Sequence, residues 1–273
     1  MKLNTKSLFR VIPGIDLMGG VVVHGVKGER EKYRPVKSIL CERAELFPIV
    51  EAFVRKLGLR EFYIADLDAI MFSRQRDHLD LITDRRTEGL NTFGTISFMV
   101  DAGVFDIADV GKILKAGIDQ VIMGTETLPS LTTLQDIIDC YGADHLVVSL
   151  DTKDSLVLSA APEIADMAVP QALSLLKEFG IRHYILLELG KVGTSAGLNK
   201  ELIKECLSVL DVHSSERGNS FLLGGGVSGY EDLHWLRDMG VSGAIVATAL
   251  HDGRLTNQNL SQLNIGLPGS GAN

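Results

Sequence analysis

The stretch SFLLGGGVSGYEDLHWLRDMGVSGAIVATAL, residues 220–250, decides the fold. Apolar and β-branched runs near its two ends predict buried strands, and the amphipathic run between them predicts a helix that Gly240 stops. The expected elements are a strand at 221–223, a helix at 230–239 and a strand at 244–246. This order is typical of a parallel sheet whose strands are joined by crossover helices.

Glycines directly follow the first of these strands, and a turn of small residues follows the second. Such turns let backbone N–H groups point at an anion, and the N-terminus of the next helix adds about half a positive charge. In eight-stranded α/β barrels the turns after strands seven and eight commonly hold a phosphate. The favoured interpretation is a phosphate cup made by Gly225, Gly226, Ala247 and Thr248.

Two other interpretations of the glycines stay open. They could form only a tight turn. They also match the GxGxxG fingerprint of dinucleotide-binding folds at Gly224, Gly226 and Gly229. That fingerprint needs an acidic residue on the following strand, which here ends in AIVAT without one.

Length and composition predict one domain over residues 1–273, because α/β barrels use about 250 residues as a single unit. The net charge of −8 and the absence of a basic run argue against nucleic acid and membranes as partners. The three cysteines and seven histidines are scattered, so we expect no metal, no cofactor and a cytoplasmic location. The oligomeric state is open.

Short β-branched runs recur along the chain, each followed by polar residues and a helical pattern. Together with the two strands above they predict a closed (β/α)8 TIM barrel, an α/β fold. The further strands are expected at 10–15, 62–65, 97–100, 120–123, 145–150 and 183–187.

An offset of 123 residues superposes residues 97–125 on residues 220–248 with eight identities. A fixed offset across two strands and a helix indicates a duplicated unit. The barrel is therefore expected to consist of two half-barrels, roughly 9–140 and 141–260.

Asp16 and Asp151 end the first and fifth strands, so two-fold symmetry would place them opposite one another across the barrel mouth. Two facing carboxyl groups suit general acid/base catalysis on one substrate. Alternatively, either residue caps a loop or pairs with Lys153 or Arg34. A long first loop with a small hairpin carries basic residues, among them Lys27, that either reach a substrate or stay solvated.

Four motifs together resemble the histidine-biosynthesis barrels, the phosphoribosylformimino-aminoimidazole-carboxamide ribotide isomerase and its sister cyclase. They are IPGIDL (12–17), ADLDA (65–69), SLDTK (149–153) and LLGGGVS (222–228). The resemblance implies a substrate with two phosphates, one held by each half, and an Amadori rearrangement of an aminoaldose. It also implies catalysis by aspartates at the positions of Asp16 and Asp151.

The sequence departs from this family at two places. The sixth-strand loop has Val192 where the family has a catalytic carboxylate and Leu187 where it has a threonine; Glu188 either substitutes or pairs with a neighbouring base. Thr194, with Lys27, remains an expected substrate-loop residue. The third-strand turn reads DAGVF (101–105) in place of GGGIR, and Glu126 follows the fourth strand.

Added carboxylates disfavour a second phosphate, because like charges at ~4 Å cost several kcal/mol at a protein-like dielectric. We therefore expect one intact phosphate site and one altered anion site that takes an amine, a hydroxyl or nothing. The altered site comprises Gly103, Gly124 and Thr125.

The sequence predicts a divergent isomerase- or lyase-type enzyme for a phosphorylated, ribose-derived small molecule, using aspartate acid/base catalysis in an Amadori-type aldose–ketose isomerisation. One alternative is the authentic histidine-pathway ribotide isomerase. Another is a barrel that binds a phosphorylated ligand without catalysis.

Overall fold

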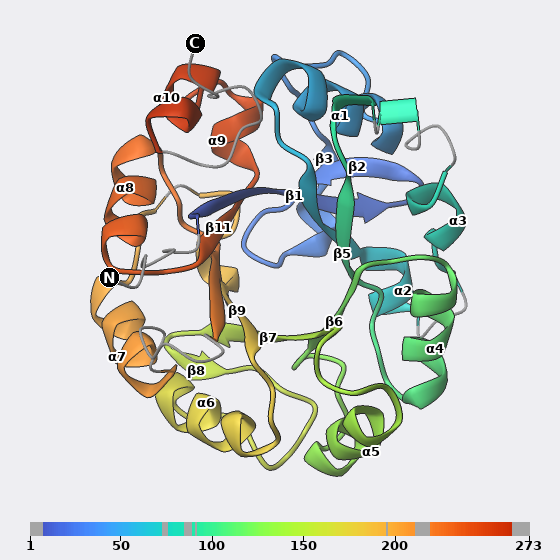
Figure 1. The fold of residues 1–273 in the computed structure, drawn as a ribbon, viewed down its shortest axis with the longest axis vertical. Helices are drawn as coiled ribbons and strands as arrows, with labels where there is room; N and C mark the ends of the chain where they lie inside the picture. Colours follow the sequence, from blue (N-terminus) through green and yellow to red (C-terminus); the bar gives the residue numbers. More distant parts are fainter. Residues whose placement is uncertain are drawn as a thin grey trace, which may run out of the picture.

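Eight parallel strands close into a barrel in the computed structural model, which describes residues 8–72, 76–84, 89–90, 92–194, 196–210 and 219–263 (Figure 1). Around the barrel the strands are β1 (Arg10–Met18), β4 (Glu61–Asp66), β5 (Ser97–Asp101), β6 (Gln120–Gly124), β7 (Leu146–Lys153), β9 (His183–Glu188), β10 (Ser220–Gly224) and β11 (Gly243–Val246). Pairing of β11 with β1 closes the circle. The predicted (β/α)8 barrel is confirmed, and each of its eight strands overlaps the predicted range.

Helices form an outer ring around the strands (Figure 1). They are α1 (Leu46–Ala52), α2 (Leu67–Met71), α3 (Leu79–Ile82), α4 (Ile107–Lys115), α5 (Leu131–Tyr141), α6 (Val169–Glu178), α7 (Lys200–Leu210), α8 (Tyr230–Asp238), α9 (Thr248–His251) and α10 (Asn257–Gln262). Asp106 and Ser130 cap α4 and α5 because their side chains accept backbone N–H groups of the first helical turn. No helix within the described ranges is both long and apolar enough to cross a membrane.

The barrel interior follows from the two-residue period of a strand, which sends alternate side chains inward. One residue from each barrel strand fills an inner apolar layer: Ile12, Tyr63, Met99, Ile122, Val147, Ile185, Leu222 and Ile245. A second, larger cluster packs between the strands and the helices. Side chains two or four positions further along each strand therefore point into the mouth at the strands' carboxyl ends.

The predicted internal repeat appears in the strand register. Met99 pairs with Gln120 in the first half, and Leu222 pairs with Gly243 in the second, each shifted by the same 123 residues. Equivalent turn contacts recur too: Asp109 accepts the N–H of Phe105 at 2.9 Å, and Asp232 accepts that of Ser228 at 2.8 Å. The two units thus share backbone pairing as well as sequence. The wider division at residues 140 and 141 stays a prediction.

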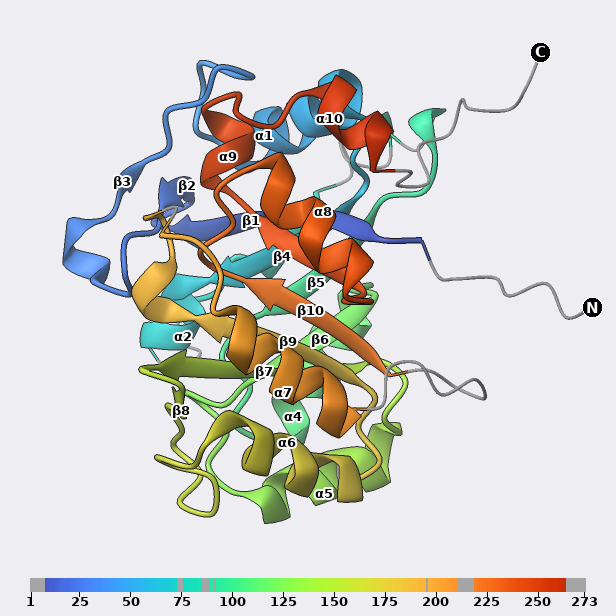
Figure 2. The same cartoon turned by 90° about the vertical axis from the view of Figure 1, so that its left-hand side faces the viewer.

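Three short strands extend the barrel at its carboxyl end. The predicted hairpin after the first strand is confirmed as β2 (Val21–His24), which pairs antiparallel with β1 and with β3 (Arg34–Pro35). β8 (Leu156–Val157) pairs with the end of β7. In Figure 2 these strands project from one end of the barrel. The loop between β2 and β3 returns over the mouth, where the N–H of Lys27 donates to the carbonyl of Val192 at 3.0 Å.

Candidate active site

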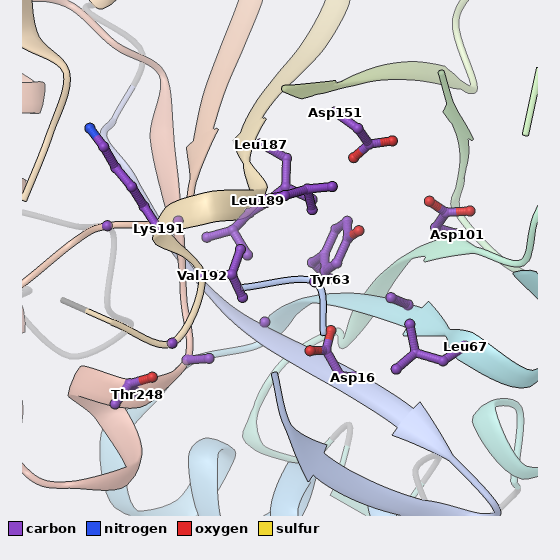
Figure 3. A pocket seen from close by; sticks show the side chains of 18 of the residues that line it. Asp16, Tyr63, Leu67, Asp101, Asp151, Leu187, Leu189, Lys191, Val192 and Thr248 are labelled. Carbon is purple, nitrogen blue, oxygen red and sulfur yellow. The ribbon is translucent and has the colours of Figure 1, made fainter. Parts of the chain in front are cut away.

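A cavity of about 200 Å³ opens at the carboxyl ends of the strands. Figure 3 shows Asp16, Asp101 and Asp151 around it, on three different strands of the barrel. Each aspartate lies two or four positions beyond the inner apolar layer, so the strand period directs its side chain inward. The structure thus brings both predicted catalytic carboxylates, Asp16 and Asp151, to one cavity.

Asp16 is half-buried near the end of β1. Gly25, at the end of the hairpin, fits directly against its carboxylate, because a β-carbon there would collide with Oδ2. Burial raises the pKa of Asp16 from 3.8 to about 6, and the positive charge of Arg30 partly offsets this. A carboxyl group with this pKa is a competent base near neutral pH.

Asp101 and Asp151 approach Gly124 from the strands on its two sides. A β-carbon on Gly124 would lie 3.0 Å from Oδ2 of Asp101 and 3.4 Å from Oδ2 of Asp151. Burial raises the pKa of Asp101 to about 7, although the N–H of Gly103 donates to its Oδ1 at 3.0 Å and lowers it. Burial, and then the charges of Asp101 and Glu126, hold the pKa of Asp151 well above its ordinary value.

Neither predicted catalytic aspartate has a salt-bridge partner among the described residues, so the alternative that they pair with Lys153 or Arg34 is not observed. Arg34 instead donates to the carbonyls of Glu31 and Tyr33.

Tyr63 lies between the carboxylates, in the inner layer of the barrel (Figure 3). Burial raises its pKa well above 10.0, and the negative charges of Asp101, Asp151, Asp16 and Glu126 raise it further. Tyr63 was not among the site residues predicted from the sequence. The signal that could have found it is the strand period, because Tyr63 stands two positions before Ala65 on the inward face of β4.

Both basic side chains that line the cavity are already paired. Nη2 of Arg30 lies 2.9 and 2.7 Å from the two carboxylate oxygens of Glu126. Nζ of Lys191 lies 3.0 Å from Oε2 of Glu188. The expectation that Glu188 pairs with a neighbouring base is confirmed, and this residue is not part of the cavity wall. The sixth-strand loop instead presents Val192 and Leu187 to the cavity, so it offers no carboxyl group there.

All four predicted cup residues line the cavity. Gly225 and Gly226 have φ angles of 84° and 81°, the left-handed region that favours glycine. A β-carbon on Gly226 would stand 2.7 Å from the carbonyl oxygen of Gly197, so this position also requires glycine for space. Within the described ranges the N–H groups of Gly226 and Val227 donate to no protein acceptor. They remain available to an oxyanion.

The equivalent site in the first half is closed by protein. Thr125 is 0% exposed, and its hydroxyl donates to the carbonyl of Leu158 at 2.8 Å. That hydroxyl also accepts the N–H of Asp151, and the N–H of Ala160 donates to the carbonyl of Thr125. Asp101 stands where the repeat has Gly224. The donors expected from Gly103 and Thr125 are thus satisfied within the fold.

The two predicted substrate-loop side chains do not reach the cavity wall. Lys27 is exposed, and the hydroxyl of Thr194 donates to the carbonyl of Lys191 at 2.8 Å. The loop supplies Arg30 instead. The sequence alone does not distinguish Arg30 from the other basic residues of this loop, because the direction of each side chain depends on how the loop folds back over the mouth.

A second polar cluster lies at the end of β4. Ligand atoms of Asp66, Asp68 and His78 lie within 4.8 Å of one another. The N–H of His78 donates to Asp66 at 2.6 Å, and its Nδ1 lies 3.0 Å from the same carboxylate. These bonds fasten the segment that begins α3 to the barrel. The sequence did not indicate this group, and the expectation that no metal binds stays a prediction.

The fold and the site define an α/β barrel with a ligand cavity at the carboxyl ends of its strands. The chain matches the family described as histidine biosynthesis protein over residues 10–256 and belongs to it. The family resemblance predicted from the four motifs is confirmed.

Individual relatives cover nearly the whole chain. An uncharacterized protein of Methanocaldococcus jannaschii is 32% identical over 249 residues, which span 90% of this chain and 95% of that protein. The 1-(5-phosphoribosyl)-5-((5-phosphoribosylamino)methylideneamino) imidazole-4-carboxamide isomerase of Syntrophomonas wolfei is 28% identical over 251 residues, or 90% of this chain and 94% of the enzyme. The isomerase of the same name from Streptococcus thermophilus is 25% identical over 249 residues, or 90% and 96%.

Proposed function

We propose that this protein is a divergent isomerase of the family, which converts a phosphorylated, ribose-derived aminoaldose into its aminoketose. The observation that carries the proposal is the meeting of Asp16, Asp151 and the glycine cup in one cavity. Relatives named as isomerases support the reaction class. A small phosphorylated substrate, a cytoplasmic location and the absence of a cofactor are parts of the same proposal.

The two aspartates suit opposite roles because their environments separate their pKa values. Asp16, with a pKa of about 6, is mostly ionised at neutral pH and serves as the base. Burial and the charges of Asp101 and Glu126 raise the pKa of Asp151, which favours its protonated form, so we assign it the role of the acid. Asp151 replaces the acid that Val192 cannot provide.

The proton transfers made by Asp16 and Asp151 balance over one turnover. Asp151 protonates the ring oxygen as the bond from C1 to that oxygen breaks, which leaves an iminium at C1. Asp16 removes the proton from C2, and the resulting enaminol receives a proton from Asp16 at C1. The C2 hydroxyl proton returns to Asp151 as the ketone forms, so both aspartates end in their starting states.

Proton exchange at carbon tests this proposal. Ribose 5-phosphate and ammonium form an aminoaldose in solution. Turnover in D₂O removes its C2 proton and delivers deuterium to C1 of the aminoketose once Asp16 has exchanged with solvent, and the reverse reaction then returns deuterium to C2, as followed by proton NMR. We expect exchange that depends on enzyme and is lost in Asp16→Asn but kept in Asp136→Asn, which removes a carboxylate from the exposed face of α5. Exchange that is equal with and without protein would contradict the proposal.

Val192 and Leu187 favour a second candidate, a barrel that binds a phosphorylated ligand without turnover, because both put apolar side chains where acid/base groups would act. Saturable binding of ribose 5-phosphate without any exchange at C2 would support it.

The authentic pathway isomerase is less favoured, because its substrate carries two phosphates and Thr125 of the first-half site is hydrogen-bonded to Leu158 and Ala160. Complementation of a histidine auxotroph that lacks this isomerase tests it. We expect no growth, and growth would support this alternative.

A further inference from the structure

The hydroxyl of Tyr63 is a polar group at the cavity wall, on a side chain that is itself largely buried. Tyr63 is 6% exposed, and no described residue forms a hydrogen bond with its hydroxyl. Its ring lines the cavity, with the hydroxyl toward the side of Asp101 and Asp151 (Figure 3). A ligand group that bonds to this hydroxyl would gain about 0.5–1.5 kcal/mol, the net value of one hydrogen bond.

Asp101 and Asp151 provide carboxylate acceptors on the side of the cavity toward which this hydroxyl points (Figure 3). They are 7% and 6% exposed. Oδ2 of Asp101 has no hydrogen-bond partner among the described residues, and Oδ2 of Asp151 has only the N–H of Glu126 at 3.4 Å. The repulsion between two buried carboxyl groups directed at Gly124 favours a single negative charge on the pair. A cation between them and the tyrosine would balance that charge.

Among the residues that the structure describes, no cation fills this role. Arg30 is held by both oxygens of Glu126, and Lys191 is held by Glu188. A second phosphate would meet the carboxylates without a free counter-charge. The acidic half of the cavity is therefore suited to a positively charged part of the ligand.

The geometry favours a nitrogen over a metal ion. Among the described residues, Asp66, Asp68 and His78 form the one group of three potential ligands within 4.8 Å of one another. Asp16, Asp101 and Asp151 are spread more widely than that, whereas a divalent cation needs several oxygens at 2.0–2.6 Å at once. A protonated amine offers three donors, which match two carboxylates and a phenol oxygen, and it interacts well with an aromatic ring.

We propose that Tyr63, Asp101 and Asp151 bind a protonated nitrogen of the substrate, while the glycine cup binds a single phosphate at its other end. This inference rests on the proposed function and names the substrate class as an amine monophosphate. Asp101 is the principal ion-pair partner, which leaves Asp151 free to hold its proton. Transfer of one proton from this nitrogen to Asp101 frees the lone pair that expels the ring oxygen, and the product amine takes that proton back.

A matched set of ligands tests the inference by isothermal titration calorimetry at neutral pH. Short aminoalkyl phosphates of increasing length are compared with hydroxyalkyl phosphates and with bisphosphates of the same lengths. We expect the best aminoalkyl phosphate to bind at least about tenfold more tightly than its hydroxyl counterpart, the size of a single charge-assisted contact. The bisphosphate of that length should bind more weakly than the amine.

Two variants test which side chains cause the preference for the amine ligand. Asp101→Asn and Tyr63→Phe keep the side-chain shape, and each should reduce the preference for the amine at least threefold without changing the affinity for hydroxyalkyl phosphates. Asp136→Asn, on the exposed face of α5, removes the same charge and should keep the preference.

The results separate the inference from the proposed function. Equal binding of amine and hydroxyl ligands, or tighter binding of bisphosphates, would overturn the inference while the phosphate cup stands. A preference for the amine that survives Asp101→Asn would also overturn it, as would binding that requires added Mg²⁺ or Mn²⁺. Failure of every phosphate to bind would contradict the proposed function itself.

Discussion

Asp101 and Asp151 converge on one glycine, since a β-carbon on Gly124 would lie 3.0 Å from Oδ2 of the first and 3.4 Å from Oδ2 of the second. The fold thus keeps two acidic groups close together in a buried site. Proteins that place like charges in this way commonly do so for function rather than stability.

The free energy of unfolding should depend on pH because of this arrangement. The pKa of Asp101 is raised to about 7 in the folded protein, so the folded state holds its proton more tightly than the unfolded chain. The stabilisation is fully present below pH 3.8 and is lost as the pH rises to about 7. Asp101→Asn should therefore be more stable than the wild type, and melt at a higher temperature. The difference in the free energy of unfolding should grow from pH 4 to pH 8, up to about 4 kcal/mol.

Calorimetric melting of both proteins across this range measures the effect, with Asp136→Asn as the exposed control. A difference in melting temperature that does not change with pH would mean that Asp101 is ionised throughout.

Turnover should follow a bell-shaped pH profile. Activity requires ionised Asp16, whose pKa is about 6, and protonated Asp151, whose pKa is raised. The rate should rise through about pH 6 and fall at higher pH as Asp151 loses its proton. Asp16→Asn should lower kcat at least about 100-fold, the usual effect of losing a general base. Initial rates of exchange at C2 measure both effects, and a flat profile between pH 5 and pH 8 would contradict the assigned roles.

The phosphate cup should depend on Gly226. Alanine there combines a φ of 81° with a β-carbon 2.7 Å from the carbonyl oxygen of Gly197. Gly117→Ala is the matched control, because Gly117 has a φ of 89° and open space around it. Both variants should lose about 1–2 kcal/mol of stability from backbone strain. Only Gly226→Ala should weaken phosphate binding, by about tenfold or more, in a ³¹P NMR titration; equal affinities would place the anion elsewhere.

Glu126 should keep Arg30 from binding a second anion. Glu126→Gln removes the partner that holds the guanidinium and also a charge that raises the pKa of Asp101 and Asp151. We expect both carboxyl pKa values to fall, as seen by ¹³C NMR, and the affinity for ribulose 1,5-bisphosphate to rise severalfold. Glu29→Gln, which frees Lys32 on the same loop, serves as control. An unchanged affinity in both variants would show that Arg30 does not control anion binding.

The sequence predicted the parts of this protein that depend on local pattern. Strand positions followed from short β-branched runs, and the ends of strands one and five located Asp16 and Asp151. The cup followed from glycines placed directly after a strand. The repeat predicted the shared register, because pairs such as Met99 with Gln120 recur at the same offset in the second half.

The parts that sequence analysis missed depend on contacts between distant segments. Arg30 meets Glu126 across 96 positions, and Thr125 meets Leu158 across 33. No local pattern reports such contacts, because they depend on how loops return over the barrel mouth. The closed first-half site and the paired state of Arg30 follow from them, and so does the exclusion of Lys27 and Thr194 from the cavity wall.

A crystal structure grown with phosphate would show whether only the second half of the barrel retains an anion site. We expect one phosphate, bound by the N–H groups of Gly226 and Val227 beside Thr248, with Asp16 and Asp151 facing the same cavity. A phosphate bound beside Thr125 and Asp101 while the cup stays empty would contradict it.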